Sequence, residues 1–303
     1  MKSVGKLLSL VVVLEYTGTR PVHAANWYGR AIQKTFIDAL TAVGYADFGD
    51  ESHRESERRP YTVSSLNGLS NDDNGFLLPG RRFHLRLTSL NDAVFSALVR
   101  ATEMGAPLGL GAELTMINQP FAIRGMTADQ LPAAFQSYEE IWETRPASQE
   151  EQDSPIGLQI ASPAYFKITD LERCYPLTFI GHESGLVCHM PLPALFFQSL
   201  FEKWNTFAPS GLHIDDEAIT TFHRKVFPAR MELQSESVKL TFTGKPPVFH
   251  IGCAGYVSYN AGKRSPPEVR RILEIMMNYA LFAGVGHDTT FGFGQCGPAF
   301  CES

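Results

Sequence analysis

The order of periodic segments along the chain is the feature that most limits how it can fold. Stretches of strand-like apolar spacing alternate with stretches whose apolar residues recur at helical spacing. The first half reads strand, helix, strand, strand, helix, strand, and the second half repeats that order. Two βαββαβ units in succession predict an α+β protein with two tandem ferredoxin-like domains, the RRM-like architecture.

The expected elements follow from apolar spacing and from start and stop residues. Arg82, His84 and Arg86 alternate with three apolar residues, as in a half-buried strand. Ser89 and Asp92 resemble the capping box of a second helix. The predicted strands cover residues 7–15, 61–66, 81–87, 110–118, 156–162, 238–242, 248–259 and 293–300. The other predicted helices cover residues 25–43, residues 193–204 and the stretch that begins at 265–268.

The length of the chain agrees with two domains. A single core stops growing at roughly 250–300 residues, and this chain has 303. The segment 136–155 is acidic and polar and contains Pro146, which is typical of a linker or an exposed loop. We therefore predict an N-terminal domain over residues 1–135, a linker or loop over residues 136–155 and a C-terminal domain over residues 156–303.

The charge of the chain argues against broad, nonspecific binding of nucleic acid. The net charge is −6. Residues 224–303, however, hold nine Lys or Arg against six Asp or Glu, a local charge of +3. Binding of RNA would therefore depend on a local basic cleft.

Two further features concern the compartment. The five cysteines form no CxxC pair, which fits a reducing compartment without a disulfide framework or a zinc site. An apolar run over residues 7–14 follows Lys2 and Lys6, as in a signal peptide, but Glu15 and Arg20 lie between this run and the possible cleavage site at 22–24. The run also fits a buried strand, so we expect a cytoplasmic protein without a membrane span.

The most informative segment runs from Gly284 to Gly294 (GVGHDTTFGFG) and places four glycines in eleven residues between a helix and a strand. Glycine permits positive φ and close approach of another backbone. Exposed N–H groups in such a loop can bind an anion, and a tight helix-to-strand turn is the other interpretation. The segment lacks the GK[ST] of a phosphate-binding Walker loop.

Four segments, in order, resemble one known family. Residues 283–295 (AGVGHDTTFGFGQ) resemble the C-terminal glycine-rich loop of the repeat-associated RNA-binding (RAMP) superfamily of CRISPR systems. More narrowly, they resemble the loop of the CRISPR-associated endoribonuclease that processes precursor CRISPR RNA. Residues 59–66 (RPYTVSSL), 160–167 (IASPAYFK) and 191–205 (PLPALFFQSLFEKWN) resemble three other segments of that family. The resemblance spans most of the chain.

The resemblance implies cleavage of CRISPR repeat RNA to mature guide RNA, without metal or cofactor. A ribose 2′-hydroxyl attacks the adjacent phosphate and leaves a 2′,3′-cyclic phosphate and a 5′-hydroxyl. Histidine suits the proton transfers because its pKa lies near neutrality, and arginine suits stabilisation of charge. His53 is the expected general acid or base, Arg58 and Arg59 the charge-stabilising residues, and Tyr28 the third member of a triad. His23 is the alternative histidine.

The remaining site predictions concern RNA binding. Arg82 and Arg86 equally fit the solvent face of a strand, and Arg270 and Arg271 the polar face of the last helix. The residues predicted to bind RNA are Gly284, Gly286, His287, Gly292, Gly294, Arg270, Arg271, Arg82 and Arg86. Expected partners are precursor and mature repeat RNA, and other CRISPR effector subunits.

Two other functions stay open at this point. A non-catalytic relative would bind guide RNA within an effector complex and keep the glycine loop without the histidine chemistry. An exported binding protein would lose its first 24 residues.

Overall fold

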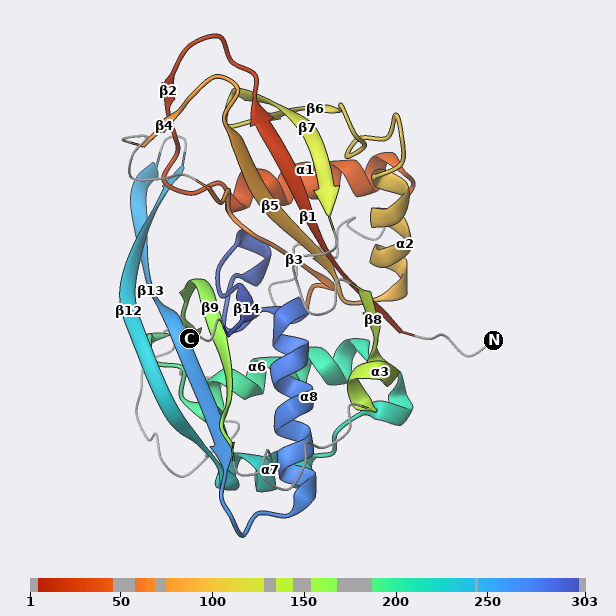
Figure 1. Ribbon diagram of the computed structural model, residues 1–303, viewed down its shortest axis with the longest axis vertical. Coiled ribbons are helices and arrows are strands. Elements are labelled where there is room, and N and C mark those ends of the chain that lie inside the picture. Colours follow the sequence, from red (N-terminus) through yellow and green to blue (C-terminus); the bar gives the residue numbers. More distant parts are fainter. Residues whose placement is uncertain are drawn as a thin grey trace.

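The computed structural model describes residues 5–45, 58–68, 75–127, 135–143, 154–167, 187–242 and 245–299. Two larger antiparallel sheets, each covered by helices, make up its two halves (Figure 1). His53 and half of the predicted linker, residues 144–153, lie outside the described residues.

The first sheet is built around β1 (Lys6–Tyr16). Its strands lie in the order β3-β5-β1-β7-β6, and every pairing is antiparallel. The neighbours of β1 are β5 (Arg82–Ser89) and β7 (Gln119–Thr127), while β3 (Tyr61–Val63) and β6 (Glu113–Met116) lie at the edges. This order is that of a ferredoxin-like sheet, extended by one edge strand.

The β6–β7 hairpin corrects the prediction of a single strand over residues 110–118. Ile117 and Asn118 form its two-residue turn, both with positive φ, 51° and 59°. A left-handed conformation costs a residue with a Cβ roughly 1–2 kcal/mol, so the isoleucine is unusual there. The strand next to β1 is therefore β7. Pro120 and Gly125 interrupt its apolar pattern, so the sequence did not indicate a strand there.

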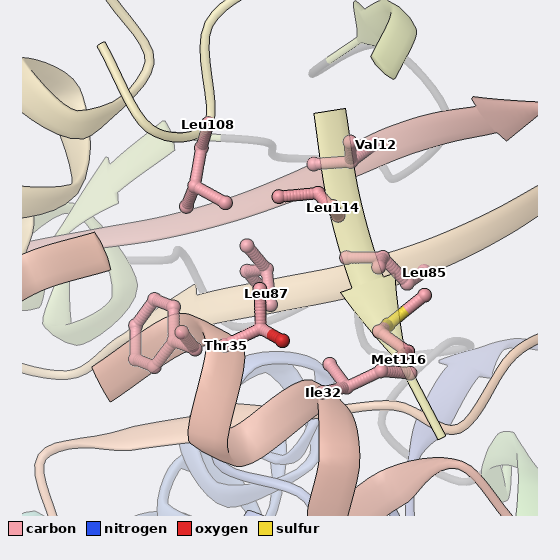
Figure 2. Close-up of a pocket in the computed structure, with 9 residues that line it drawn as sticks. Val12, Ile32, Thr35, Leu85, Leu87, Leu108, Leu114 and Met116 are labelled. Carbon is pink, nitrogen blue, oxygen red and sulfur yellow. The ribbon is translucent and has the colours of Figure 1, made fainter. Parts of the chain in front are cut away.

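Two helices cover one face of the first sheet (Figure 1). Ile32, Phe36 and Leu40 of α1 (Gly29–Ala42) are buried at helical spacing against the sheet. A cavity of only about 10 Å³ remains between α1, β1, β5 and β6 (Figure 2). Its lining is almost wholly apolar, so it is part of the packed core.

The second helix begins later than predicted. Ser89 still pairs within β5, and Asn91 is the N-cap of α2 (Asp92–Ala101), with its side chain accepting a hydrogen bond from Val94 N at 2.9 Å. Asp92 instead accepts a hydrogen bond from Lys6 N at 2.8 Å, which ties the helix start to β1.

The start of the predicted linker is structured. Residues 135–142 form β8 (Phe135–Ser137), which pairs with β1, and α3 (Tyr138–Trp142). Ser137 and Glu140 form a reciprocal capping box. An acidic, polar sequence concealed this short helix because its apolar residues are few.

The second sheet repeats the order of the first. Its strands lie in the order β12-β13-β9-β14, all antiparallel. β9 (Ile156–Ala164) is central, β12 (Val226–Phe242) and β13 (Lys245–Ala261) form a long hairpin, and β14 (Cys296–Pro298) is the short last strand. β12 begins twelve residues before the predicted strand, because its first half alternates with charged residues.

Helices pack on this sheet as well. α6 (Pro193–Phe207) and α8 (Pro267–Ala283) bury long apolar stripes, and prolines open both. The sequence analysis missed α7 (Asp216–Lys225), capped by Asp215, whose mostly polar residues hide the buried Phe222. The remaining short elements are β2 (Val22–His23) with β4 (Phe76–Leu77), β10 (Phe166–Lys167) with β11 (Val187–Cys188), η3 (Ser210–Leu212) and η4 (Thr289–Phe291).

Tyr138 joins the two halves at one end. Its hydroxyl donates to Leu90 O at 2.8 Å and lies 3.3 Å from the Tyr279 hydroxyl, while its ring packs edge-on against Trp204. Leu7, from the first sheet, belongs to the same buried cluster. The prediction of two tandem ferredoxin-like domains is confirmed, whereas their boundaries at residues 135 and 156 stay a prediction.

We expect Asn91→Ala to lower the free energy of unfolding by about 1 kcal/mol, because the Val94 N–H loses its acceptor at the start of α2. Asn91→Ser, which restores a short acceptor, should retain most of the stability. Urea unfolding of the three proteins measures this, and equal stability of the alanine variant and the wild type would contradict the assignment of the cap.

Candidate functional site

The glycine-rich loop connects α8 to β14 and includes η4. Gly284, Gly286, Gly292 and Gly294 all have positive φ, between 60° and 92°, and all four are buried. A Cβ at Gly286 would collide with Tyr165 O, one at Gly292 with Ser65 N, and one at Gly294 with Val285 O. The glycines are therefore required for packing of the loop against protein backbone, and their contact with RNA stays a prediction.

The segment between β9 and β10 holds one side of the loop. Gly294 N donates to Pro163 O and His287 N to Tyr165 O, each at 2.9 Å. The Tyr165 hydroxyl also donates to the Asp288 carboxylate, so Tyr165 holds the loop by its backbone and by its side chain. Burial and the charge of Asp288 raise the pKa of Tyr165, which keeps this hydroxyl protonated.

Ser162 closes the base of the loop. Its hydroxyl donates to Gly292 O and accepts a hydrogen bond from Gln295 N, both at 2.8 Å. The Gln295 side chain then donates to Val63 O of β3 at 3.2 Å. The loop is thus hydrogen-bonded to both halves of the molecule.

The other side of the loop lies against the start of α1. Trp27 Nε1 donates to Phe291 O at 2.6 Å, and the guanidinium of the exposed Arg30 lies 4.7 Å from the centre of the Phe291 ring. A Cβ at Gly29 would overlap Phe291 O. Figure 1 shows the segment between α8 and β14 next to β3. The first domain therefore contributes a tryptophan and an exposed cation to the surroundings of the loop.

A group of rings extends from the loop to the long hairpin. Tyr165 lies between His250 of β13 and His287, with ring centroids 5.4 and 6.1 Å away. Phe293 contacts Tyr165, His250 and Trp27. His287 and His250 are partly exposed, so they offer ring and hydrogen-bonding groups at the edge of the loop.

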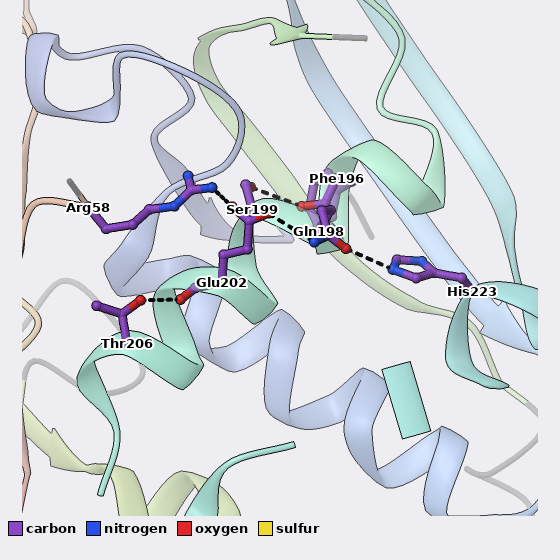
Figure 3. Close-up of polar contacts among 7 residues, drawn as sticks. All are labelled: Arg58, Phe196, Gln198, Ser199, Glu202, Thr206 and His223. Atoms are coloured by element: carbon purple, nitrogen blue, oxygen red, sulfur yellow. Dashed lines mark hydrogen bonds and ion pairs between the residues drawn. The ribbon is translucent and has the colours of Figure 1, made fainter. Parts of the chain in front are cut away.

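The structure brings some of the predicted catalytic residues to this region. Arg58 forms an ion pair with Glu202 of α6 (Figure 3), and Arg59 lies beside the Tyr61 hydroxyl, which accepts from Gln33 Nε2 at 2.9 Å. Burial raises the pKa of Tyr61, and the charge of Arg59 opposes that rise.

Tyr28 is buried at the start of α1. Its backbone N–H donates to Ser65 Oγ at 3.0 Å, and its hydroxyl accepts a hydrogen bond from Ala25 N at 3.3 Å. Burial raises the pKa of Tyr28. The alternative histidine, His23, lies in β2, with its ring 4.0 Å from that of Phe76.

Lys203 is a buried cation beside the loop that the sequence analysis did not single out. Its ammonium group donates to Ala283 O at 2.6 Å and to Thr289 Oγ1 at 3.1 Å, which joins the C-terminus of α8 to η4. Burial, with the positive charge of Arg58 as the second cause, lowers the pKa of Lys203 to about 7. The only sequence signal was its place within the segment 191–205.

A chain of polar contacts runs along α6 away from the loop (Figure 3). Glu202, the partner of Arg58, accepts from Gln198 Nε2 at 2.9 Å, and Gln198 Oε1 lies 3.4 Å from His223 Nε2. His223 is buried on α7, and this burial lowers its pKa to about 4.

The other predicted RNA-binding arginines lie in different environments. Arg270 is buried and donates to Glu274, to Ser154 O and to Asn260, while Arg271 lies over the Trp142 ring and donates to Trp142 O. Arg270 and Arg271 thus hold Ser154 and Trp142, respectively, against α8.

The two arginines of β5 also differ from each other. Arg86 donates to Ser9 Oγ at 2.8 Å and to Cys296 O at 2.6 Å, so it bridges β5 to β14, and burial lowers its pKa to about 10. Arg82 is exposed beside Glu15. Contact of these arginines with RNA stays a prediction, although Arg86 already serves as a contact between the two halves.

Within the described ranges, no three His, Cys, Asp or Glu side chains are grouped so as to hold a metal ion. In the same part of the chain, no helix has the length and apolarity that crossing a membrane requires.

Comparisons with known proteins agree with this geometry. Residues 158–296 match the family model of the CRISPR-associated endoribonuclease Cas6. A Cas6 in a product complex is 20% identical with a TM-score of 0.68, over 97% of this chain and 99% of that chain. Thermus thermophilus Cas6 is 18% identical with a TM-score of 0.65, at the same coverage. A Cas6-related protein from Pyrococcus furiosus is 11% identical with a TM-score of 0.58, over 98% of this chain and all of that chain. No curated protein matches the sequence.

Two ferredoxin-like domains are joined through a glycine-rich loop, and the fold of solved Cas6 proteins extends over almost the whole chain. The sequence match is confined to residues 158–296, so it shows that the second domain is similar to Cas6 endoribonucleases. The resemblance found in the sequence is thereby confirmed.

We expect Gly294→Ala to destabilise the protein by about 1–3 kcal/mol more than Gly80→Ala, as judged by urea unfolding. Both glycines have positive φ, but a Cβ at Gly294 would overlap Val285 O, whereas Gly80 faces open space. The control thus removes the cost of the left-handed backbone, and equal losses would show that packing of the loop does not require the glycine.

We expect the free energy of unfolding to fall by up to roughly 3 kcal/mol as the pH drops from about 6.5 to 4, because the unfolded chain binds a proton at His223 before the folded one does. Below pH 4 this contribution is constant. His223→Gln should remove that part of the pH dependence, while His84→Gln, on the exposed side of β5, should retain it. Equal slopes in all three proteins would contradict the prediction.

Proposed function

We propose that this chain is a metal-independent endoribonuclease that cleaves CRISPR repeat RNA to give mature guide RNA, with a 2′,3′-cyclic phosphate and a 5′-hydroxyl as the products. The observation that carries the proposal is where the glycine-rich loop lies. It contacts both the start of α1, at Trp27, and β3, at Val63, and the segment that bears His53 connects these two elements. Arg58 and Arg59, which follow His53 in the sequence, lead directly into β3 beside the loop.

The contacts of Arg58 support the same arrangement. Arg58 pairs with Glu202, and the adjacent Lys203 donates to Thr289 of the loop. Arg58, which follows His53 in the sequence, is therefore connected to the loop through Glu202 and Lys203, which are neighbours on α6. In this proposal His53 transfers protons to and from the ribose and the leaving oxygen, and the positive charges of Arg58 and Arg59 stabilise the phosphorane.

Tyr28 and the loop serve binding and positioning. Because burial keeps the Tyr28 hydroxyl protonated, it acts as a hydrogen-bond donor and not as a base. Arg30 and His287, both partly or fully exposed beside the loop, offer a charge for phosphate and a ring for a base. The partner is repeat RNA before and after cleavage, in the cytoplasm, with other effector subunits as possible neighbours.

A second function is favoured by one observation. Glu202 forms an ion pair with Arg58 and neutralises its charge, which leaves one arginine fewer to stabilise the phosphorane. A chain that binds guide RNA without cutting it would retain the loop and its contacts. Incubation of the purified protein with the repeat RNA of its own genome, in EDTA, separates the two functions, because only the first gives cut RNA with mapped cyclic-phosphate ends.

We expect His53→Ala to slow single-turnover cleavage by roughly 10²-fold or more, the usual contribution of general acid–base catalysis. The affinity for RNA should change little, since phosphate contacts elsewhere dominate binding. His84→Ala, on the exposed side of β5, is the matched control and should cut at the normal rate.

Different failures have different meanings. Normal cleavage by His53→Ala together with slow cleavage by His23→Ala would move the role to His23 and leave the function intact. If neither change matters and EDTA abolishes cleavage, the metal-independent mechanism is wrong.

A further inference from the structure

The strand β6 forms an open edge of the first sheet. Among the described strands it pairs with β7 alone, and it ends the strand order β3-β5-β1-β7-β6. The two-residue turn at Ile117 and Asn118 makes Met116 and Gln119 a hydrogen-bonded pair, and the pairs then alternate along the hairpin. Thr115 and Glu113 therefore belong to non-hydrogen-bonded pairs.

In such pairs the N–H and C=O groups point away from the partner strand. The opposite residue, Pro120, shows this directly, because its carbonyl accepts from Thr17 N on the β1 side at 3.2 Å. The backbone groups of Glu113 and Thr115 accordingly face outward from β7. No hydrogen bond to these outward groups from the described residues is present.

A groove of about 500 Å³ lies along this edge. One wall is α1, at Thr35, Asp38 and Ala39, and the other consists of β6 and of residues 105–107. The distance along α1 from Gly29, at the glycine-rich loop, to Asp38 is roughly 14 Å at 1.5 Å per residue. The groove is therefore separate from the proposed RNA site.

The surroundings of the groove expose large apolar side chains. Met104 is 94% exposed, Leu110 61% and Ile117 46%, and all three lie in the segments that adjoin β6. Ile117 in addition has a left-handed backbone, which a β-branched residue rarely adopts. Strained, exposed apolar residues beside an open strand edge indicate a binding surface.

The charge of the groove selects the partner. Asp38 and Glu113 line it, and none of the lining residues is a cation. Lys34 pairs with Asp38 from the same helix, but both side chains are largely exposed and such pairs are weak. Two copies of β6 would bring like charges together, and RNA would be repelled, whereas a segment with lysine or arginine is attracted.

We propose that the edge of β6 binds an extended, basic segment of a partner protein by strand addition. The segment continues the first sheet through the outward backbone groups of Glu113 and Thr115. Its apolar side chains lie on the α1 side, beside Ala39 and Leu114, and its basic side chains lie on the side of Glu113.

The test uses the full chain and a fluorescent, end-capped octapeptide of alternating lysine and valine. Thr115→Pro removes the outward N–H without breaking the β6–β7 ladder, since proline is tolerated at such edge positions. Thr115→Val keeps the N–H and is the matched control. We expect the wild type and the valine variant to bind the peptide, and the proline variant to bind it at least tenfold more weakly.

Charge and folding are tested in the same assay. The corresponding glutamate–valine peptide should bind the wild type at least tenfold more weakly, and Glu113→Lys should reverse this preference. Unchanged thermal unfolding and repeat-RNA affinity show that each variant is folded; should the proline variant unfold, the charge-reversed variant alone decides.

Several results would overturn the proposal. They are the absence of peptide binding at millimolar concentration, equal binding of the two peptides, and equal binding by the proline and valine variants. Competition between repeat RNA and the peptide would place the peptide at the RNA site. Self-association that Thr115→Pro abolishes would show that the edge instead binds a second copy of this chain.

Discussion

The contact of the glycine-rich loop with the first domain is the constraint on which the rest of the site depends. Phe291 O lies so close to α1 that residue 29 has to be glycine, and Trp27 donates a hydrogen bond to that same oxygen. Gly292 meets the backbone of Ser64 and Ser65, directly after β3, in the same way. Because backbone meets backbone at both points, small shifts of one domain against the other are resisted by sterics as well as by hydrogen bonds. A loop in this position fixes the distance between the second domain and both α1 and β3 of the first domain.

Buried charge surrounds that contact, and its arrangement explains how the region remains stable. Lys203, Arg58 and Arg86 are all basic and all partly or fully withdrawn from water. Lys203 and Arg86 each donate to one main-chain carbonyl and one side-chain hydroxyl, both uncharged, and Arg58 pairs with Glu202. Carbonyl groups satisfy the donors but do not neutralise the charge, so burial lowers the pKa of Lys203 and Arg86. A polyanion brought to the loop would offset this positive charge, which favours an RNA-binding role for the region over a purely structural one.

The sequence predicted those features that depend on local periodicity. The burial of alternate residues in β5 and of every third or fourth residue in α1, α6 and α8 is set by the apolar pattern, and the duplicated βαββαβ order followed from it. β7, α3 and α7 were missed because proline, glycine or charged residues obscure their short apolar patterns. For the site, the sequence located the glycines but did not show why glycine is needed at each position. A Cβ at Gly294 would overlap Val285 O, and Lys203 donates to Thr289; both contacts depend on how the folded chain packs. His53 lies outside the described residues, so its role still rests on the resemblance.

The arginines show why residue type alone does not assign function. Arg82, Arg86, Arg270 and Arg271 fit equally well on a basic surface and on a solvated face, and the structure adds a third possibility for three of them. Arg86 joins β5 to β14, Arg270 holds Ser154 and Arg271 covers Trp142. Each of these guanidinium groups donates to a backbone carbonyl of a distant segment, which an arginine can do because its planar group carries five donors. Exposed Arg30 instead lies over a ring of the glycine-rich loop, with its guanidinium 4.7 Å from the centre of the Phe291 ring. An arginine that no sequence pattern marked thus lies where the two domains meet, whereas three of the four arginines that the sequence marked hold protein segments together.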